Sequence, residues 1–297
     1  MEKELIFKKV ERFHDKYYKQ LLFIPIAILI LSLFYLTLLY SNTGDFIHKD
    51  ISLTGGTSIT IYENIDADKL KLDLSDKFEE INTREVYDLL TREKKAIIIE
   101  TKTEGEEVKE ILEEYLGYKL DEKNSSFEFT GSALSENFYR QLIVAIFFAF
   151  IFMALVVFII FRKIVPSVAV IISAFADIVM TLALVDILGI KMSSAGIVAF
   201  LMLIGYSVDT DILLTNRVLK SNQGTLNERI FGAFKTGITM TLTSFLAVLI
   251  ALIVSISFSV VLTQIFTVLV IGLGFDILNT WITNVSLLKW YVKKNEN

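Results

Sequence analysis

The sequence predicts a polytopic α-helical membrane protein with six membrane-spanning helices and one small α+β domain between the first two helices. Three observations support this fold class. Of the 297 residues, 53% are hydrophobic, and the mean hydropathy is +0.56. The apolar residues gather in six runs of about twenty, the length that crosses ~30 Å of hydrocarbon. The longest interval between runs, residues 41–140, is polar and acidic.

The six apolar runs set the expected helix boundaries. A basic tail over 1–20 precedes the first helix at 21–40, and a short tail over 289–297 follows the remaining helices within 141–288. Each run contains few charged residues, because a charged side chain in contact with lipid is unfavourable. The later five helices are predicted at Leu142–Phe161, Val165–Ile187, Ala195–Leu214, Ile238–Phe258 and Leu262–Leu287.

Residues 41–140 hold 23 acidic and 13 basic side chains in segments of alternating and helical periodicity. These periodicities predict four strands and two helices in the order β-α-β-β-α-β, which is that of the ferredoxin-like split motif. We interpret the segment as an acidic module without a site of its own. The predicted strands are Thr57–Tyr62, Ile81–Leu89, Ala96–Lys102 and Ser125–Thr130, and the predicted helices are Asp66–Phe78 and Glu106–Leu116.

The basic residues of the short loops predict the orientation, because cytoplasmic loops are enriched in Lys and Arg. The tails and two of the loops share this enrichment, whereas the short loops on the opposite side contain only Lys191. Both termini are therefore expected in the cytoplasm, with the 41–140 domain outside. The basic residues on the cytoplasmic side are Lys3, Lys8, Lys9, Arg12, Lys16, Lys19, Arg162, Lys163, Arg217, Lys220, Arg229, Lys235, Lys289, Lys293 and Lys294.

Four carboxylates fall inside the apolar runs and are candidates for a proton relay: Asp177, Asp209, Asp211 and Asp276. A charge near the bilayer centre costs several kcal/mol, so an acidic residue there is a functional candidate. Asp186 is expected nearer the outer interface, where a charge costs little, and its Asn variant is expected to have little effect.

Polar side chains also form stripes on the last two membrane helices, at the i, i+3, i+4, i+7 spacing that aligns them on one face. Such stripes either pack helices together or join a relay. On the fifth helix the stripe is Thr236, Thr239 and Thr243, and on the sixth it is Asp276, Asn279, Thr280 and Thr283.

The candidate carboxyls have a second interpretation. Each could be neutral and hydrogen-bonded by hydroxyl groups such as that of Ser207, or paired with Arg217 or Lys235 near the inner surface. Both alternatives stay open from the sequence alone.

The run Thr54, Gly55, Gly56 and Thr57 is interpreted as structural, because paired glycines permit the positive φ angles of a sharp turn. The chain has no cysteine, and its two histidines, His14 and His48, are far apart. We see no nucleophile–base pair, phosphate loop or metal cluster. We therefore expect no enzymatic activity, no cofactor, no metal and no nucleic-acid partner.

Four motifs in this layout resemble those of the SecF family, a membrane subunit of the SecD–SecF protein-export complex in the RND superfamily. Asp50–Thr57 resembles its Asp-x-Thr-Gly-Gly-Thr signature, and Gly205-Tyr206-Ser207 followed by Asn216-Arg217 resembles its fourth-helix signature. Thr236–Leu242 is similar to the Thr/Ser-rich start of the family's fifth helix. Gly272-Leu273-Gly274 is similar to the glycines of its sixth helix. Bacterial members read Asn-Asp-Thr where this chain has Asp209-Thr210-Asp211, so the pattern looks more like the archaeal branch.

The resemblance implies an RND-like half that promotes protein export with a SecD-like subunit and is coupled to the proton gradient. It implies contact with the Sec translocation channel, unfolded secretory polypeptide and membrane lipid. It also favours Asp209 and Asp211 as proton carriers, since RND-like proteins place such carboxylates on the fourth helix. The alternatives are an RND-like transporter half for lipids or hydrophobic solutes, and a non-conducting structural partner. A single six-helix half implies a partner chain or a homodimer.

Overall fold

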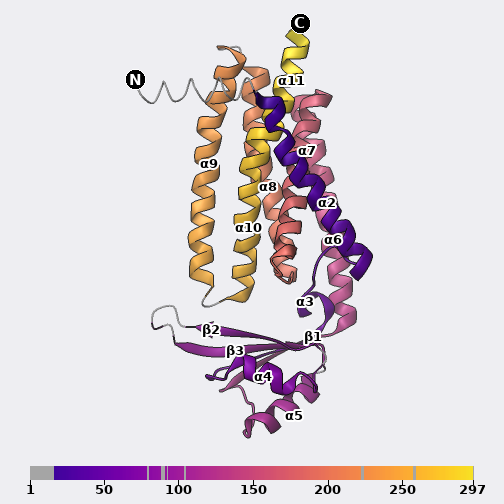
Figure 1. The fold of residues 1–297 in the computed structure, drawn as a ribbon, viewed down its shortest axis with the longest axis vertical. Helices are drawn as coiled ribbons and strands as arrows, with labels where there is room; N and C mark the ends of the chain where they lie inside the picture. Colours follow the sequence, from indigo (N-terminus) through magenta and orange to yellow (C-terminus); the bar gives the residue numbers. More distant parts are fainter. Residues whose placement is uncertain are drawn as a thin grey trace.

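The computed structural model describes residues 17–78, 80–87, 91, 93–103, 105–221, 224–256 and 259–296. A bundle of long helices occupies one end of the molecule, and a four-stranded sheet with two helices occupies the other (Figure 1). Within the described residues, six helices are long and apolar enough to cross a membrane, as predicted. The bundle consists of α2 (Phe23–Thr43), α6 (Ser132–Phe161), α7 (Ile164–Ile187), α8 (Ser194–Lys220), α9 (Leu226–Ser255), α10 (Val260–Leu278), the π-helix η1 (Asn279–Asn284) and α11 (Val285–Glu296).

The sheet domain follows α2 through the short helix α3 (Ile51–Thr54). Its elements succeed one another in the predicted β-α-β-β-α-β order, and the strands lie in the sheet order β2-β3-β1-β4. All neighbouring strands are antiparallel, with Ile59 opposite both Ile99 and Phe127. The elements are β1 (Gly56–Ile61), α4 (Ala67–Leu74), β2 (Asn82–Tyr87), β3 (Lys94–Thr101), α5 (Gly105–Leu116) and β4 (Ser125–Thr130).

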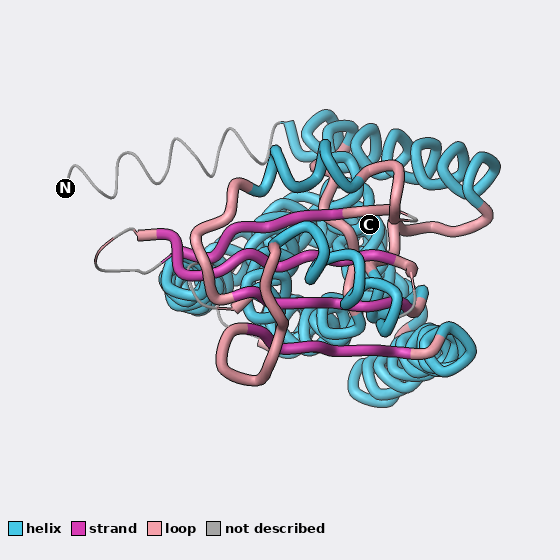
Figure 2. The backbone as a smooth tube through the Cα atoms, turned by 90° about the horizontal axis from the view of Figure 1, so that it is seen from below, coloured by secondary structure: helices cyan, strands magenta, loops and turns pink. Residues whose placement is uncertain are grey.

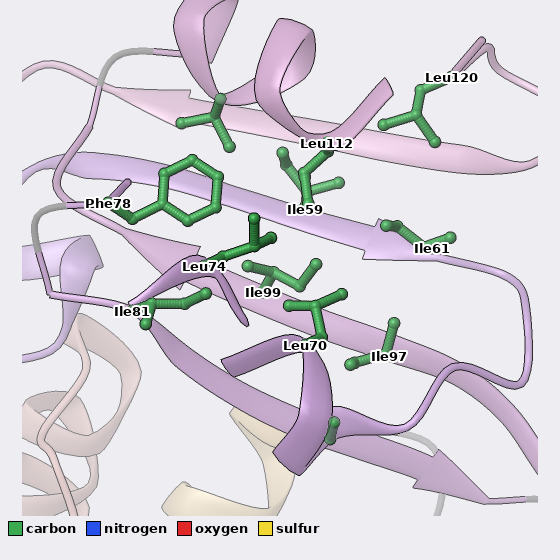
Figure 3. Close-up of a cluster of buried hydrophobic side chains, with 12 residues drawn as sticks. Ile59, Ile61, Leu70, Leu74, Phe78, Ile81, Ile97, Ile99, Leu112 and Leu120 are labelled. Carbon is green, nitrogen blue, oxygen red and sulfur yellow. The ribbon is translucent and has the colours of Figure 1, made fainter. Parts of the chain in front are cut away.

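The two faces of this sheet differ in chemistry because side chains alternate along a strand. Ile59 and Ile61 of β1 and Ile97 and Ile99 of β3 point toward α4 and α5 and form the domain core (Figure 3). The intervening side chains, such as Ser58 and Thr60, are polar and line a cavity with residues of the helix bundle. Figure 2 shows the strands lying across the end of the bundle. The polar face of the sheet thus meets the membrane helices.

Several helices extend beyond the apolar runs that predicted them. Helix α6 begins at Ser132, before Leu142, and α8 continues past Leu214 to Lys220. Helix α9 begins at Leu226, where Thr225 and Glu228 form a capping box that satisfies the first backbone donors. Hydropathy detects only the part of a helix that contacts lipid, so it misses these polar ends. Three predicted parts lie outside the described residues. They are residues 1–16 of the N-terminal tail, the end of a predicted strand at Leu89 and the end of a predicted helix at Phe258.

The last membrane helix contains a π-helix, Asn279–Asn284, which the periodicity did not predict. π turns are wider than α turns and are common at functional sites. In a regular α-helix Asn284 would lie ~80° away from the stripe that begins at Asp276. The wider turn rotates Asn284 back toward this stripe.

Close packing of α10 on α8 depends on Gly272. A Cβ atom built at this glycine would lie 2.4 Å from Leu203 Cδ2, and Leu203 is fully buried. Gly274 on the same helix has no atom within 4 Å of its hypothetical Cβ. Small residues at such positions let membrane helices approach one another.

We predict that Gly272→Ala lowers the free energy of unfolding by ~1–3 kcal/mol, because the added methyl group overpacks the contact with Leu203. Gly274→Ala is the matched control and is expected to leave stability unchanged or slightly raised, since alanine favours helix. Thermal melting of both variants in detergent measures the difference. Equal melting temperatures would contradict the packing described here.

Candidate functional site

Three carboxylates from three membrane helices converge in the interior of the bundle. Asp177 of α7, Asp211 of α8 and Asp276 of α10 are all buried, with at most 1% of each residue exposed. Side-chain hydrogen bonds connect Asp211 to Asp276, and the backbone carbonyl of Ser207 links this pair to the partners of Asp177. We call this set the carboxylate network; its members are Ser173, Asp177, Ser207, Thr210, Asp211, Asp276, Asn279, Thr280, Thr283 and Asn284.

Asp177 is held by one donor from α8 and one from the π-helix. Ser207 Oγ donates to Asp177 Oδ2 at 2.6 Å, and Asn279 Nδ2 donates to Asp177 Oδ1 at 2.7 Å. Thr283 Oγ1 in turn donates to Asn279 Oδ1 at 3.2 Å, which fixes the orientation of the amide. The serine of the Gly-Tyr-Ser motif therefore serves to orient this carboxyl group.

Asp211 receives three donors on a single oxygen. Thr280 Oγ1, Asn284 Nδ2 and Ser173 Oγ lie 2.9, 2.8 and 3.4 Å from Asp211 Oδ1. Asp211 Oδ2 is buried and has no partner among the described residues. One oxygen of this carboxyl is therefore free to hold a proton or a water molecule.

Thr280 connects Asp211 to Asp276. Its Oγ1 lies 2.9 Å from Asp211 Oδ1 and 3.1 Å from Asp276 Oδ1. Thr210 Oγ1 lies 3.2 Å from Asp276 Oδ1 and also donates to the Ser207 carbonyl at 2.9 Å. A hydroxyl group has one hydrogen to donate, so Thr280 can donate to only one of the two carboxylates at a time.

None of these three carboxylates lies within ion-pair distance of a Lys, Arg or His side chain in the described chain. Arg217 Nη2 instead donates to Thr236 Oγ1 at 3.1 Å, and Lys235 is exposed. The two predicted charge partners are therefore directed away from the network. From the sequence, the buried carboxyls could either be hydrogen-bonded by hydroxyl groups or be paired with Arg217 or Lys235. In the structure, hydroxyl and amide groups hydrogen-bond to them, and neither basic residue pairs with them.

The structure separates Asp209 from the other three candidate carboxylates. Asp209 is exposed on α8, whereas Asp211, two residues later, is buried. Two residues correspond to a rotation of ~200° on a helix, so the two side chains leave on opposite faces. Asp209 makes no hydrogen bond within the described residues and is not part of the network.

The threonine stripe of α9 also lies outside the network. Thr239 and Thr243 are exposed, and their hydroxyl groups donate to backbone carbonyls one turn earlier, at 2.8 and 2.7 Å. Thr236 is half-buried and contacts Arg217. The predicted stripe on the last helix, in contrast, is entirely buried and takes part in the network.

Asp186 is held by contacts that the sequence did not predict. It is buried, and its carboxylate is hydrogen-bonded to the phenol of Tyr35 at 2.6 Å and to the backbone amide of His48 at 3.0 Å. His48 Nδ1 lies 2.7 Å from the same carboxylate. Asp186 lies one residue before the end of α7 and joins α2, α7 and the connector to the sheet domain. Its expected position near the outer interface stays a prediction, whereas these contacts were not predicted. The contacts come from residues far apart in sequence, which no local pattern could reveal.

The glycine motif lies at the entry to the sheet. Gly55 and Gly56 have φ angles of +83° and +142°, which side-chain-bearing residues rarely adopt. A Cβ atom at Gly55 would lie 2.4 Å from Ser132 Cα, so the backbone itself leaves no room. Thr54 Oγ1 bonds to the Asp50 carbonyl, and Thr57 Oγ1 donates to the Thr103 carbonyl at 2.8 Å. These contacts are all within the protein and favour a structural role.

Sequence reasoning missed Ser173, Thr210 and Asn284. Ser173 precedes Asp177 by four residues, and Asn284 follows Thr280 by four, so the helical i, i+4 rule contained a usable signal for both. Thr210 lies between the two aspartates of α8, and a single threonine in an apolar run carries no signal of its own. In the described chain, no three His, Cys, Asp or Glu side chains are arranged to hold a metal ion.

We predict that Thr280→Val lowers the free energy of unfolding by ~1–3 kcal/mol, because two buried carboxyl groups lose the hydroxyl that they share while side-chain shape is kept. Thr239→Val is the control, since that hydroxyl is exposed and bonds only to its own helix. Chemical or thermal unfolding in detergent compares the two variants. A Thr280→Val protein as stable as the Thr239→Val protein would show that Thr280 does not support the network.

Comparisons with known proteins agree with this architecture. Residues 108–294 match the family described as protein export membrane protein SecD/SecF, C-terminal. The chain is 45% identical to the protein-export membrane protein SecF of Methanocaldococcus jannaschii, covering 93% of this chain and 96% of the relative. It is 38% identical to the protein of the same name from Methanolacinia petrolearia, covering 93% and 94%. These relatives are archaeal, as the Asp209-Thr210-Asp211 pattern predicted.

The fold is also found among solved structures. The crystal structure of SecDF, a translocon-associated membrane protein from Thermus thermophilus, superposes with a TM-score of 0.72 at 18% identity. The match covers 93% of this chain but only 38% of the SecDF chain. SecDF in its super-membrane-facing form gives a TM-score of 0.58 at the same identity, covering 94% of this chain and 39% of that one. At this identity the likeness establishes the fold alone. The family match over more than half of the chain and the relatives over nearly all of it show that the chain belongs to the SecF family of protein-export membrane proteins.

Proposed function

We propose that the chain is an accessory subunit of the Sec translocase that works with a SecD-like subunit and couples proton movement to protein export. Family membership supports the role in export. The proton coupling rests on one observation, the Thr280 hydroxyl shared between Asp211 and Asp276. If one of the two carboxyls is protonated, it donates to Thr280 Oγ1 while Thr280 donates to the other. Transfer of the proton reverses both hydrogen bonds without moving a heavy atom.

The surroundings of the carboxylate network favour a bound proton. Three negative charges in a membrane interior would need compensation of many kcal/mol, and neutral donors supply only part of it. No basic side chain lies within ion-pair distance of the three carboxylates in the described chain. Protonation of some of the carboxyls removes the net charge that the neutral donors cannot compensate.

The network also extends far enough to connect three helices. Ser207 contacts Asp177 with its hydroxyl and accepts from Thr210 Oγ1 with its backbone carbonyl. Side-chain hydrogen bonds then lead from Thr210 through Asp276 and Thr280 to Asp211. A change of protonation at one carboxyl therefore changes which hydrogen bonds join α7, α8 and α10. Such rearrangement provides a means of transmitting proton movement to the helix bundle and to the sheet domain that rests on it.

A polar exposed face on α8 and α9 supports a membrane partner. Asp209 of α8 and Thr239 and Thr243 of α9 are exposed within the predicted apolar runs, and the exposed Arg217 follows at the cytoplasmic end of α8. The Arg217–Thr236 hydrogen bond places the two polar faces next to each other. Lipid contact with such a face is unfavourable. We assign this face to a SecD-like chain with its own membrane helices.

The orientation follows the distribution of basic residues. We place both chain ends in the cytoplasm and the ferredoxin-like sheet domain on the external side, where the Sec channel releases unfolded secretory polypeptide. The C-terminal end of α11, with Lys293 and Lys294, lies at the opposite end of the bundle from the sheet (Figure 1). In this arrangement the domain is next to the emerging client.

We predict that Asp211→Asn abolishes the dependence of export on the proton gradient while leaving folding and partner binding intact. The amide keeps the shape of the carboxyl but cannot titrate. Asp209→Asn should keep gradient dependence and instead lower the yield of the complex with the SecD-like chain. Export rates are measured in cells with and without a protonophore, alongside copurification of the partner.

The same measurement on Asp177→Asn and Asp276→Asn extends the test to the whole network. Full gradient-dependent export in all three single variants would mean that this chain carries no protons. Its role would then be structural support for its partner.

A further inference from the structure

A polar cleft of about 350 Å³ lies between the sheet domain and the helix bundle, away from the carboxylate network. Strand β2, the α7–α8 loop and the first two turns of α10 each contribute one side. The cleft is on the polar side of the sheet, where β2 meets the ends of the membrane helices. Its lining residues are Asn82, Thr83, Arg84, Gly189, Ile190, Lys191, Thr263, Gln264 and Thr267.

The position of the cleft corresponds to the boundary between hydrocarbon and water. The candidate span of α7 ends at Ile187, directly before the loop that carries Lys191, and the last candidate span begins at Val261. Thr263 and Thr267 lie in the first turns of that span. Phospholipid headgroups occupy this level of a bilayer.

Two cationic side chains line the cleft. Lys191 is the one basic residue in the predicted external short loops. It forms no ion pair within the described chain. Arg84 Nη2 lies 3.5 Å from Glu100 Oε2, a loose contact. Burial raises the pKa of the Glu100 carboxyl, whereas the charges of Arg84 and Lys191 act on this pKa in the opposite direction. The nearby Glu80 is already paired with Lys102 at 2.9 Å. Among the described residues Lys191 thus makes no direct ion pair and Arg84 makes one loose contact, so both side chains can bind a further anion in the cleft.

Gln264 supplies an independent sign of a missing ligand. The residue is 5% exposed, and its Nε2 donates to the Lys191 carbonyl at 3.1 Å. Its Oε1 is buried and has no partner in the part of the chain that the structure describes. A buried acceptor without a donor costs about 1–3 kcal/mol. A ligand that brings a hydroxyl or ammonium group would remove this cost.

We propose that the cleft binds the headgroup of a membrane phospholipid, with Lys191 and Arg84 on the phosphodiester and Gln264 Oε1 accepting from a headgroup hydroxyl or ammonium group. The bound lipid joins β2 of the sheet domain to α10 and the α7–α8 loop. It thereby holds the domain against the bundle at the membrane surface. This inference rests on the membrane placement of the helices and is independent of the role in export.

The test measures thermal melting of the full chain, delipidated in detergent, with short-chain phosphatidylglycerol as the probe. Phosphatidylglycerol should raise the melting temperature of the unmodified protein. Lys191→Gln should raise the half-maximal lipid concentration at least tenfold, and Arg84→Gln combined with Lys191→Gln should abolish the effect. Lys71→Gln, on the exposed side of α4, is the control and should respond like the unmodified protein. Lys191→Gln removes no ion pair of the described chain, so its folding is not at risk.

Three results would overturn the proposal. The first is the absence of stabilisation by phosphatidylglycerol, and the second is an equal response of the double variant. The third is the same stabilisation by inorganic phosphate or glycerol 3-phosphate, which would identify a free anion rather than a lipid as the ligand. Phosphatidylcholine of the same chain length lacks a headgroup donor and should stabilise less. Equal stabilisation by it would overturn the role of Gln264.

Discussion

The bundle buries three carboxyl groups, and neutral side chains supply their hydrogen bonds. The need to keep these donors in place constrains how the membrane helices pack. Each of Asp177, Asp211 and Asp276 must find its hydrogen bonds within the protein, because lipid offers none. The donors come from α7, α8 and the π-helix, so these elements are fixed relative to one another. The close approach of α10 to α8 at Gly272 and the hydrogen bond from Thr280 to Asp211 join the same two parts of the bundle. Apolar packing and polar hydrogen bonds thus act together in holding them.

The junction between bundle and sheet follows a related principle. Asp186, buried at the far end of α7, is hydrogen-bonded to Tyr35 and His48, so the connector to the sheet is anchored by a charge that cannot be left unpaired. The sheet turns its apolar face toward its own two helices and its polar face toward the bundle. Polar cavities rather than a continuous apolar core therefore separate the two parts. This difference allows the sheet to respond to the helices without loss of its own core.

Much of the architecture could be predicted because hydropathy and periodicity report directly on burial. The six apolar runs predicted the membrane helices, and the alternation of polar residues with Ile59 and Ile61 predicted a strand. The side of α8 that faces inward could not be predicted. Apolar residues surround both Asp209 and Asp211, so the sequence offers no internal reference for choosing between opposite faces. The π-helix and the contacts of Asp186 depend on tertiary neighbours, and the polar ends of α6, α8 and α9 depend on caps and packing outside the hydrocarbon.

We propose that the three carboxyls act as one linked unit. Infrared difference spectroscopy of the purified complex, stepped through pH, follows the carbonyl stretch of protonated carboxyl groups directly. The account predicts that Asp211→Asn removes its own signal and also changes the pH dependence of the signals that remain from Asp177 and Asp276. Remaining signals that are unchanged at every pH would contradict it, because the carboxyls would then titrate independently.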